Sequence, residues 1–179
     1  MIQICRVEQV DGQRLQGLAE LLVDVVDAGA SVSFMAPLAL SKALAFWQGL
    51  APAVAQGDRL LLVAEDAQGR MLGTVQLVLS QPDNQPHRAD LAKMLVHTSA
   101  RRLGLGAKLM LAAQAAAILA GKTLLVLDTV TGGDAERLYA RLGWQRVGDI
   151  PDFALMPDGA LCSTTVYYRR LAPELNSSR

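Results

Sequence analysis

The stretch HTSARRLGLGAKLM, residues 97–110, decides how the middle of the chain folds. It follows the alternating segment 88–97, which predicts a strand, and leads into an alanine-rich segment that predicts a helix ending at Ala120. Gly104 and Gly106 therefore lie in a turn between a strand and a helix, where both would let a phosphate approach the backbone. Because a helix N-terminus presents unpaired N–H groups and partial positive charge, this turn is a candidate anion site.

Two common phosphate-binding motifs do not fit the turn. A dinucleotide-binding fingerprint needs a third glycine where Leu109 stands, and a Walker loop needs a Gly-Lys-Ser/Thr sequence that is absent. What remains is the pattern Arg-x-x-Gly-x-Gly, formed by Arg101, Gly104 and Gly106. Glycine pairs also begin ordinary helices, so on this motif alone a plain strand–helix turn stays open as an alternative.

Composition restricts the class of protein. The 179 residues, 51% apolar and 19% charged, predict one folded domain over 1–179 with a loose tail at 173–179. Lys plus Arg equals Asp plus Glu, 17 each, so no overall field draws the chain to nucleic acid or to an anionic membrane. We expect no signal peptide and no bilayer-spanning segment. Cys5 and Cys162 lie far apart without metal-ligand spacing, which predicts reduced cysteines in a cytoplasmic protein and no metal site.

The remaining segments predict a single mixed α/β sheet with helices on its faces. Asp11 is expected to cap the first helix and Pro37 to begin the second. Hydrophobic periodicity predicts the other strands at 2–8, 58–66, 71–80, 123–129, 144–150 and 162–171, and the other helices at 11–29, 37–56 and 132–143.

A second motif follows the glycine turn by about thirty residues. AERLYARLGWQRVG, residues 135–148, places a tyrosine on a short helix and a Leu-Gly-aromatic sequence before a strand. At this separation the two motifs resemble the acetyl-CoA-binding and following motifs of the GNAT family of N-acetyltransferases, and the resemblance covers about residues 58–150. GASVSFMA (29–36), LDT (127–129) and MPDG (156–159) are similar to the tabtoxin-resistance-type acetyltransferases.

The resemblance implies a fold and a cosubstrate. The fold is a mixed, mostly antiparallel twisted sheet of about seven strands with helices on both faces and a splay between the strands at 88–97 and 123–129. Backbone N–H groups of Met94, Leu95 and Val96 would polarise the thioester of acetyl-CoA. The pyrophosphate of CoA would bind the turn formed by Arg101, Arg102, Leu103, Gly104, Leu105, Gly106 and Ala107. The chain departs from the family at Thr98, Arg102 and Leu103, where many members carry proline, glycine and a basic residue.

Two carboxylates are candidates for the base that removes the proton of an ammonium acceptor. Asp90 is expected on the same strand face as Met94 and Val96, and it matches the glutamate base of histone-acetylating relatives. The alternative for Asp90 is an exposed strand-edge charge near Arg88. Asp128 ends an otherwise apolar strand, and its alternative is a turn-forming residue.

Three aromatic or apolar side chains complete the candidate site. The resemblance implies that Tyr139 is the general acid, while its helical spacing leaves a core aromatic as the alternative. Phe34 and Met35, in a loop without period, either line the acceptor pocket or form a hydrophobic plug. Tyr167 and Tyr168 alternate on the last strand, so at most one of them can line a site.

These features predict acetyl transfer from acetyl-CoA to the amino group of a small molecule by direct attack in a ternary complex. A toxin-like amino acid such as tabtoxinine-β-lactam is the acceptor that the resemblance implies. The expected partner is this amine acceptor, without nucleic acid or membrane, and a homodimer through the last strand is plausible. A non-catalytic acyl-CoA sensor and a peptide or protein N-acetyltransferase stay open as alternatives, since one fold serves many substrates.

Overall fold

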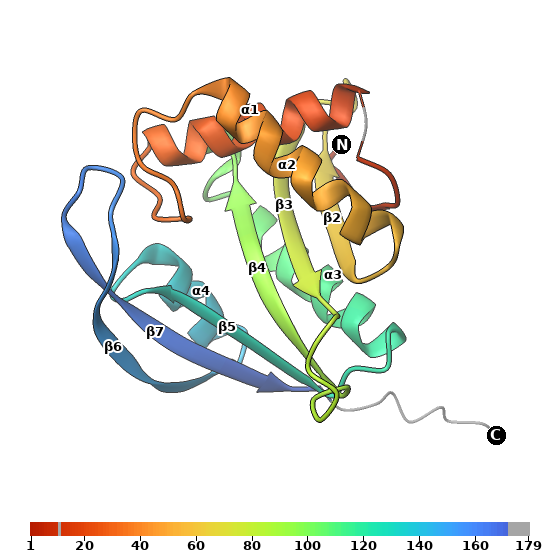
Figure 1. Cartoon of the computed structure of the whole chain (residues 1–179), viewed down its shortest axis with the longest axis vertical. Coiled ribbons are helices and arrows are strands. Elements are labelled where there is room, and N and C mark those ends of the chain that lie inside the picture. Colours follow the sequence, from red (N-terminus) through yellow and green to blue (C-terminus); the bar gives the residue numbers. More distant parts are fainter. Residues whose placement is uncertain (11, 172–179) are drawn as a thin grey trace.

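The computed structural model of the chain describes residues 1–10 and 12–171, which form one seven-stranded sheet with four α-helices (Figure 1). The strand order is β1-β2-β3-β4-β5-β7-β6; β4 and β5 are parallel, and every other neighbouring pair is antiparallel. The strands are β1 (Gln3–Val7), β2 (Arg59–Glu65), β3 (Met71–Val78), β4 (Arg88–Val96), β5 (Leu124–Val130), β6 (Gln145–Leu155) and β7 (Leu161–Arg170). The helices are α1 (Gly12–Asp27), α2 (Leu40–Ala55), α3 (Leu105–Leu119) and α4 (Asp134–Arg141). The predicted mixed, mostly antiparallel sheet is confirmed.

Two hydrophobic clusters hold the helices to opposite faces of the sheet (Figure 1). The first, here called the α3 cluster, joins α3 and α4 to strands β2 to β5 and β7. The second, the α1/α2 cluster, joins α1 and α2 to β1, β2 and residues of β3 and β4, with Trp47 fully buried. The sheet therefore lies between two separate hydrophobic cores, one on each face. None of the described helices combines the length and the apolar character needed to cross a membrane.

β4 and β5 are neighbours over a short distance only. They pair at Arg88–Asp90 with Leu124–Val126 and then diverge, as Figure 1 shows. On its other edge β4 pairs with β3, but the register shifts between Thr74 and Gln76, and Lys93 adopts a φ of +49°. This is a β-bulge, which inserts a residue and increases the local twist. The predicted splay between these two strands is confirmed.

Two predicted boundaries were wrong. α2 begins at Leu40, not at Pro37, because the residue before it, Ala39, keeps an extended backbone with ψ of 136°. β6 continues to Leu155, five residues past the predicted end at Ile150, because it pairs with β7 again after a register shift. The predicted cap Asp11 and the predicted tail at 173–179 lie outside the described residues.

α3 packs against β3 at a position that only glycine fits. A Cβ atom on buried Gly73 would lie 2.9 Å from Cδ1 of Leu109 and 2.9 Å from the backbone oxygen of Leu95. Replacing Gly73 therefore pushes α3 away from the sheet or breaks the β3–β4 ladder. Exposed Gly49, inside α2, has open space around its Cα and provides the matched comparison.

We expect Gly73→Ala to lower the free energy of unfolding by about 1–3 kcal/mol, the usual cost of overpacking. Gly49→Ala should raise it by about 0.5–1 kcal/mol, because alanine restricts the unfolded chain and favours a helix. Urea denaturation of both variants measures the difference. Equal effects of the two substitutions would contradict the packing described here.

Candidate active site

The turn before α3 is fixed by α1. After β4, residues Thr98–Ala100 form one 3₁₀ turn, and Thr98 donates from its backbone N and its Oγ1 to the carboxylate of Asp24, at 2.8 and 2.7 Å. The backbone then takes left-handed conformations at Arg102 (φ +61°) and Gly104 (φ +76°) before α3 begins at Leu105. The turn is thus rigidly anchored at its start.

This turn presents a row of backbone donors. The N–H groups of residues 102–107 have no backbone acceptor in the described chain, and the first helical bond runs from Lys108 N to the oxygen of Gly104, at 3.2 Å. Residues 101–104 are exposed. Oriented, unpaired N–H groups at a helix N-terminus with two arginines beside them are suited to a phosphate or another anion.

The two glycines of the turn have different roles. Gly104 has open space in front of its Cα, so a ligand can approach it closely. A Cβ on Gly106 would instead lie 3.1 Å from Leu138 of α4 and 3.9 Å from Met94. Gly106 therefore has a packing role, because its missing side chain lets α4 pack against α3, and its contact with a phosphate stays a prediction.

The bulge in β4 changes which side chains share a face. Met94 and Val96 pack toward the α3 cluster, while Leu95 belongs to the α1/α2 cluster. Ala89 and Leu91 also face the α3 cluster, so Asp90 between them points to the opposite face. The prediction that Asp90 shares a face with Met94 and Val96 was wrong, because period-two alternation does not continue through the inserted residue.

Asp90 is engaged in a local polar group. Its carboxylate forms an ion pair with Arg88 and accepts a hydrogen bond from Nε2 of Gln81 at 3.1 Å. Arg88 in turn donates to the amide oxygen of Gln81, at 2.6 Å. Asp90 also lies in the part of β4 that still pairs with β5, before the strands diverge.

Asp128 and Tyr139 interact electrostatically. Asp128 is exposed on β5, beyond the last residue that pairs with β4, and its Oδ2 accepts a hydrogen bond from Oγ1 of Thr164 at 2.8 Å. Burial raises the pKa of Tyr139, and the negative charge of Asp128 raises it further. Because its pKa is raised, the Tyr139 hydroxyl stays protonated. It forms no side-chain hydrogen bond within the described chain, so it is available to a ligand.

The loop between α1 and α2 contacts the hairpin formed by β6 and β7. Ser31 Oγ donates to the oxygen of Leu155 at 2.9 Å, and Ala36 N donates to the oxygen of Pro157 at 3.0 Å. Within this loop Phe34 packs edge-on against Phe46 of α2, with ring centroids 5.2 Å apart. Met35 is 42% exposed. Phe34 is therefore partly a packing residue, and Met35 is the more accessible of the two.

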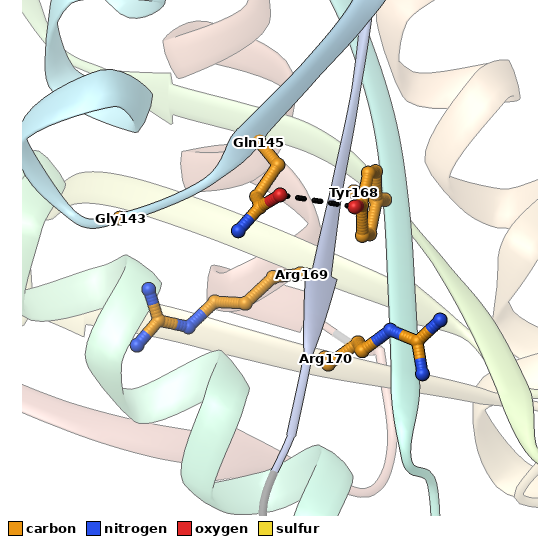
Figure 2. A pocket seen from close by; sticks show the side chains of 5 residues that line it. All are labelled: Gly143, Gln145, Tyr168, Arg169 and Arg170. Atoms are coloured by element: carbon orange, nitrogen blue, oxygen red, sulfur yellow. Dashed lines mark hydrogen bonds between the residues drawn. The ribbon is translucent and has the colours of Figure 1, made fainter.

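A shallow pocket of about 490 Å³ lies elsewhere, at the end of β7 (Figure 2). None of the predicted site residues lines it; its lining residues are Gly143, Gln145, Tyr168, Arg169 and Arg170. Tyr168 donates to Oε1 of Gln145 at 3.0 Å, and Arg169 points to the other side of the strand and donates to the oxygen of Leu142. This pocket is separate from the group formed by Asp128 and Tyr139.

Sequence reasoning missed several polar residues on the α1/α2 face, notably Arg59, Gln76 and Lys93. Arg59 donates to Oε1 of fully buried Gln76 at 2.6 Å, and Lys93 occupies the bulge. An indication was available for Gln76 and Lys93, which stand between apolar residues of their predicted strands, where buried polar residues are uncommon.

Comparison with known proteins agrees with this arrangement. The family model described as an acetyltransferase (GNAT) domain matches residues 57–146, half of the chain. The chain belongs to the GNAT family, and it is an acetyl-CoA-dependent N-acetyltransferase. Membership in this family favours the catalytic alternative over a non-catalytic sensor.

Solved structures share the whole fold. An N-acetyltransferase from Staphylococcus aureus superposes with a TM-score of 0.78 at 16% identity, covering 96% of this chain and 99% of that one. YncA of Salmonella typhimurium, solved with its cofactor acetyl-CoA, gives 0.76 at 18% identity, covering 99% and 98%. A ribosomal-protein-alanine N-acetyltransferase from Brucella melitensis gives 0.78 at 20% identity, covering 94% and 99%. At these identities the likeness establishes the fold and leaves the acceptor open.

Tyr167, on β7, ties the sheet to the helix that carries Tyr139. The two rings are 6.1 Å apart, and the buried Tyr167 hydroxyl donates to Oε1 of Glu136 at 2.8 Å. Burial and this carboxylate raise the pKa of Tyr167 to about 12, while the same hydrogen bond and the N–H of Gly132 lower the pKa of Glu136. As predicted, the adjacent Tyr168 faces the other way.

We expect Tyr167→Phe to lower the free energy of unfolding at pH 7 by about 1.5–3 kcal/mol, the usual worth of a hydrogen bond to a charged group. The pKa of Glu136 is lower in the folded than in the unfolded protein, so its contribution is complete above the ordinary glutamate range and is lost as the pH falls through the folded value. The difference between wild type and variant should therefore shrink in acid. Tyr168→Phe should change stability by less than about 0.5 kcal/mol at every pH, since its partner is neutral and exposed. Denaturation curves from pH 3 to 7 test this, and equal costs for both variants would contradict it.

Proposed function

We propose that this enzyme transfers the acetyl group of acetyl-CoA to the amino group of a small molecule within a ternary complex. The observation that carries the proposal is the row of unpaired N–H groups before α3, which follows directly after the strand that diverges from β5. The described residues share one sheet, which supports a single acetyltransferase domain. Cys5 and Cys162 are free, which supports a cytoplasmic location.

The residues of the α3 turn fit the phosphates of CoA. The unpaired N–H groups of residues 102–107 and the side chains of Arg101 and Arg102 would hold the pyrophosphate, as Leu103 and Gly104 leave the approach open. On the β5 side, the backbone of Met94, Leu95 and Val96 has no strand partner, because pairing with β5 stops at Asp90. An N–H group there would polarise the carbonyl under attack, as an oxyanion hole does.

Asp128 is our proposed base. Acetyl-CoA supplies a thioester, whose carbonyl carbon forms a bond to the amine nitrogen while its bond to sulfur breaks. An ammonium acceptor must first lose a proton, and Oδ1 of Asp128 accepts no hydrogen bond within the described chain, so it is available for that proton. Thr164 holds the carboxylate in place through Oδ2.

Asp90 is the weaker candidate for the base. Both of its oxygens are engaged, one by Arg88 and one by Gln81, so neither oxygen is free of hydrogen bonds to receive a substrate group. These contacts fit the alternative interpretation of a structural charge on the strand.

Tyr139 is our proposed proton donor to the departing sulfur. Its hydroxyl stays protonated at neutral pH because burial and Asp128 both raise its pKa. The surrounding rings of Trp144 and Tyr167, at 6.0 and 6.1 Å between centroids, keep its ring in one orientation. A fixed donor at a forming thiolate is the arrangement that general acid catalysis needs.

The proposed acceptor is a small, amino-acid-like amine. Loop 30–36, carrying Phe34 and Met35, is held by hydrogen bonds to the β6–β7 hairpin, which supports an enclosed site more than an open peptide groove. Tabtoxinine-β-lactam is one acceptor to assay, together with ordinary amino acids. Turnover of peptides but not of small amines would favour the peptide alternative.

We expect Tyr139→Phe to lower kcat about 10²-fold or more and to change the KM for acetyl-CoA little, because the hydroxyl acts on the leaving group.

Asp128→Asn should lower kcat/KM for the acceptor about 10²-fold, with partial recovery at high pH, where more of the amine is already neutral. Release of free CoA thiol measures both.

Asp90→Asn and Tyr168→Phe serve as comparisons in the same assay. A large loss of turnover in Asp90→Asn together with normal turnover in Asp128→Asn would exchange the roles of the two carboxylates. Unchanged turnover in Tyr139→Phe would remove the tyrosine from the mechanism.

A further inference from the structure

A group of polar side chains on the α1/α2 face is not used by the mechanism above. It consists of Ser33, Arg59, Gln76 and Lys93, here called the Arg59–Lys93 cluster. Ser33 comes from the loop before α2, Arg59 from β2, Gln76 from β3 and Lys93 from the bulge of β4. Four separate segments thus bring polar groups to one place.

Two donors of this cluster are buried without acceptors. Arg59 gives one N–H to Oε1 of Gln76, but its Nε is buried and has no hydrogen-bond partner. Gln76 is fully buried, and its Nε2 also lacks a partner. More than nine in ten buried polar groups in proteins are hydrogen-bonded, so two neighbouring unpaired donors indicate an acceptor that the chain does not supply.

Lys93 adds a second positive charge. Its Nζ donates to Ser33 Oγ at 3.0 Å and lies 5.7 Å from the ring centroid of Phe46. Burial and the nearby charge of Arg59 lower the pKa of Lys93, while Asp128 raises it, so the amine is within electrostatic range of both. In the described part of the chain, neither Arg59 nor Lys93 forms a salt bridge with a carboxylate.

The backbone holds Lys93 in this position at a cost. Lys93 has a positive φ, which is strained for a non-glycine residue, and such strain is concentrated at functional sites. The same bulge ends the regular pairing of β3 and β4 next to the strand divergence. The ammonium group of Lys93 thus lies against Ser33 of loop 30–36, the loop that we propose to line the acceptor site.

We propose that the Arg59–Lys93 cluster binds a carboxylate of the acceptor while the amine of the acceptor lies toward Asp128. Two partly desolvated cations without a counter-ion are unfavourable, and a carboxylate satisfies both their charge and the orphaned N–H groups. The phosphates of CoA do not compete for this cluster, because they are assigned to the turn at residues 101–107. The inference rests on the proposed function and narrows its acceptor to amino acids.

The test compares L-amino acids with their own α-carboxamides in the CoA-release assay. With the best acceptor, the wild type should prefer the acid over the amide by at least tenfold in kcat/KM. Lys93→Met, which keeps the length of the side chain, should lower that preference at least tenfold, chiefly through KM of the acid. Lys93→Arg should restore most of it. Exposed Lys42 of α2 provides the matched control, and Lys42→Met should leave the preference unchanged.

Calorimetry on the CoA-bound protein separates this inference from the proposed function. N-acetyl-L-amino acids should bind at least tenfold more tightly than their amides, and folded Lys93→Met should lose the difference. If no amine is acetylated but this binding preference and its loss are observed, the proposed function fails and the carboxylate site stands. If acids never exceed amides, in turnover or in binding, or if folded Lys93→Met keeps the preference, the inference is overturned.

Discussion

The divergence of β4 from β5 is the constraint on which the rest of this structure depends. Three residue pairs join these strands, and the bulge at Lys93 then turns β4 away. On the edge of β4 that faces β5, backbone groups beyond Asp90 are left without a strand partner, which is unfavourable in a buried sheet unless another molecule pairs with them. The pantetheine arm of CoA carries two amides, so a ligand of this kind can supply those partners. In our proposal, the divergence of β4 from β5 is therefore the place where acetyl-CoA binds.

In the proposed function, acetyl-CoA and the acceptor bind on opposite faces of the sheet. On one face, α3 and α4 form a continuous core that carries Tyr139 and the N-terminal turn of α3. On the other face, α1 and α2 form a second core, and the Arg59–Lys93 cluster lies at its edge. The charge of Asp128 acts on both residues: it raises the pKa of Tyr139 and opposes the lowering of the pKa of Lys93. We propose that acetyl transfer takes place between the two cores, where β4 and β5 diverge.

The sequence was sufficient for the elements and for the turn, because these depend on local patterns. Hydrophobic periodicity located the strands and helices, with the largest error at the end of β6, and the motifs at 101–106 and 135–148 together indicated the GNAT family. The bulge could not be predicted in this way, since an inserted residue leaves no mark on composition, and it moved Asp90 to the face opposite Met94. Contacts between distant segments, such as Ser31 with Leu155, were equally invisible. The unpaired donors of Arg59 and Gln76 likewise depend on contacts between strands and could not be predicted from the sequence.

Hydrogen–deuterium exchange with and without acetyl-CoA tests most directly whether acetyl-CoA binds at the α3 turn and at the divergent part of β4. In the free protein the amides of residues 102–107 lack acceptors and should exchange rapidly. Acetyl-CoA should protect these amides and those of residues 92–96, and it should leave the pocket lined by Gln145 and Arg170 unchanged. Protection confined to that pocket, with no change over residues 92–107, would contradict the site described here.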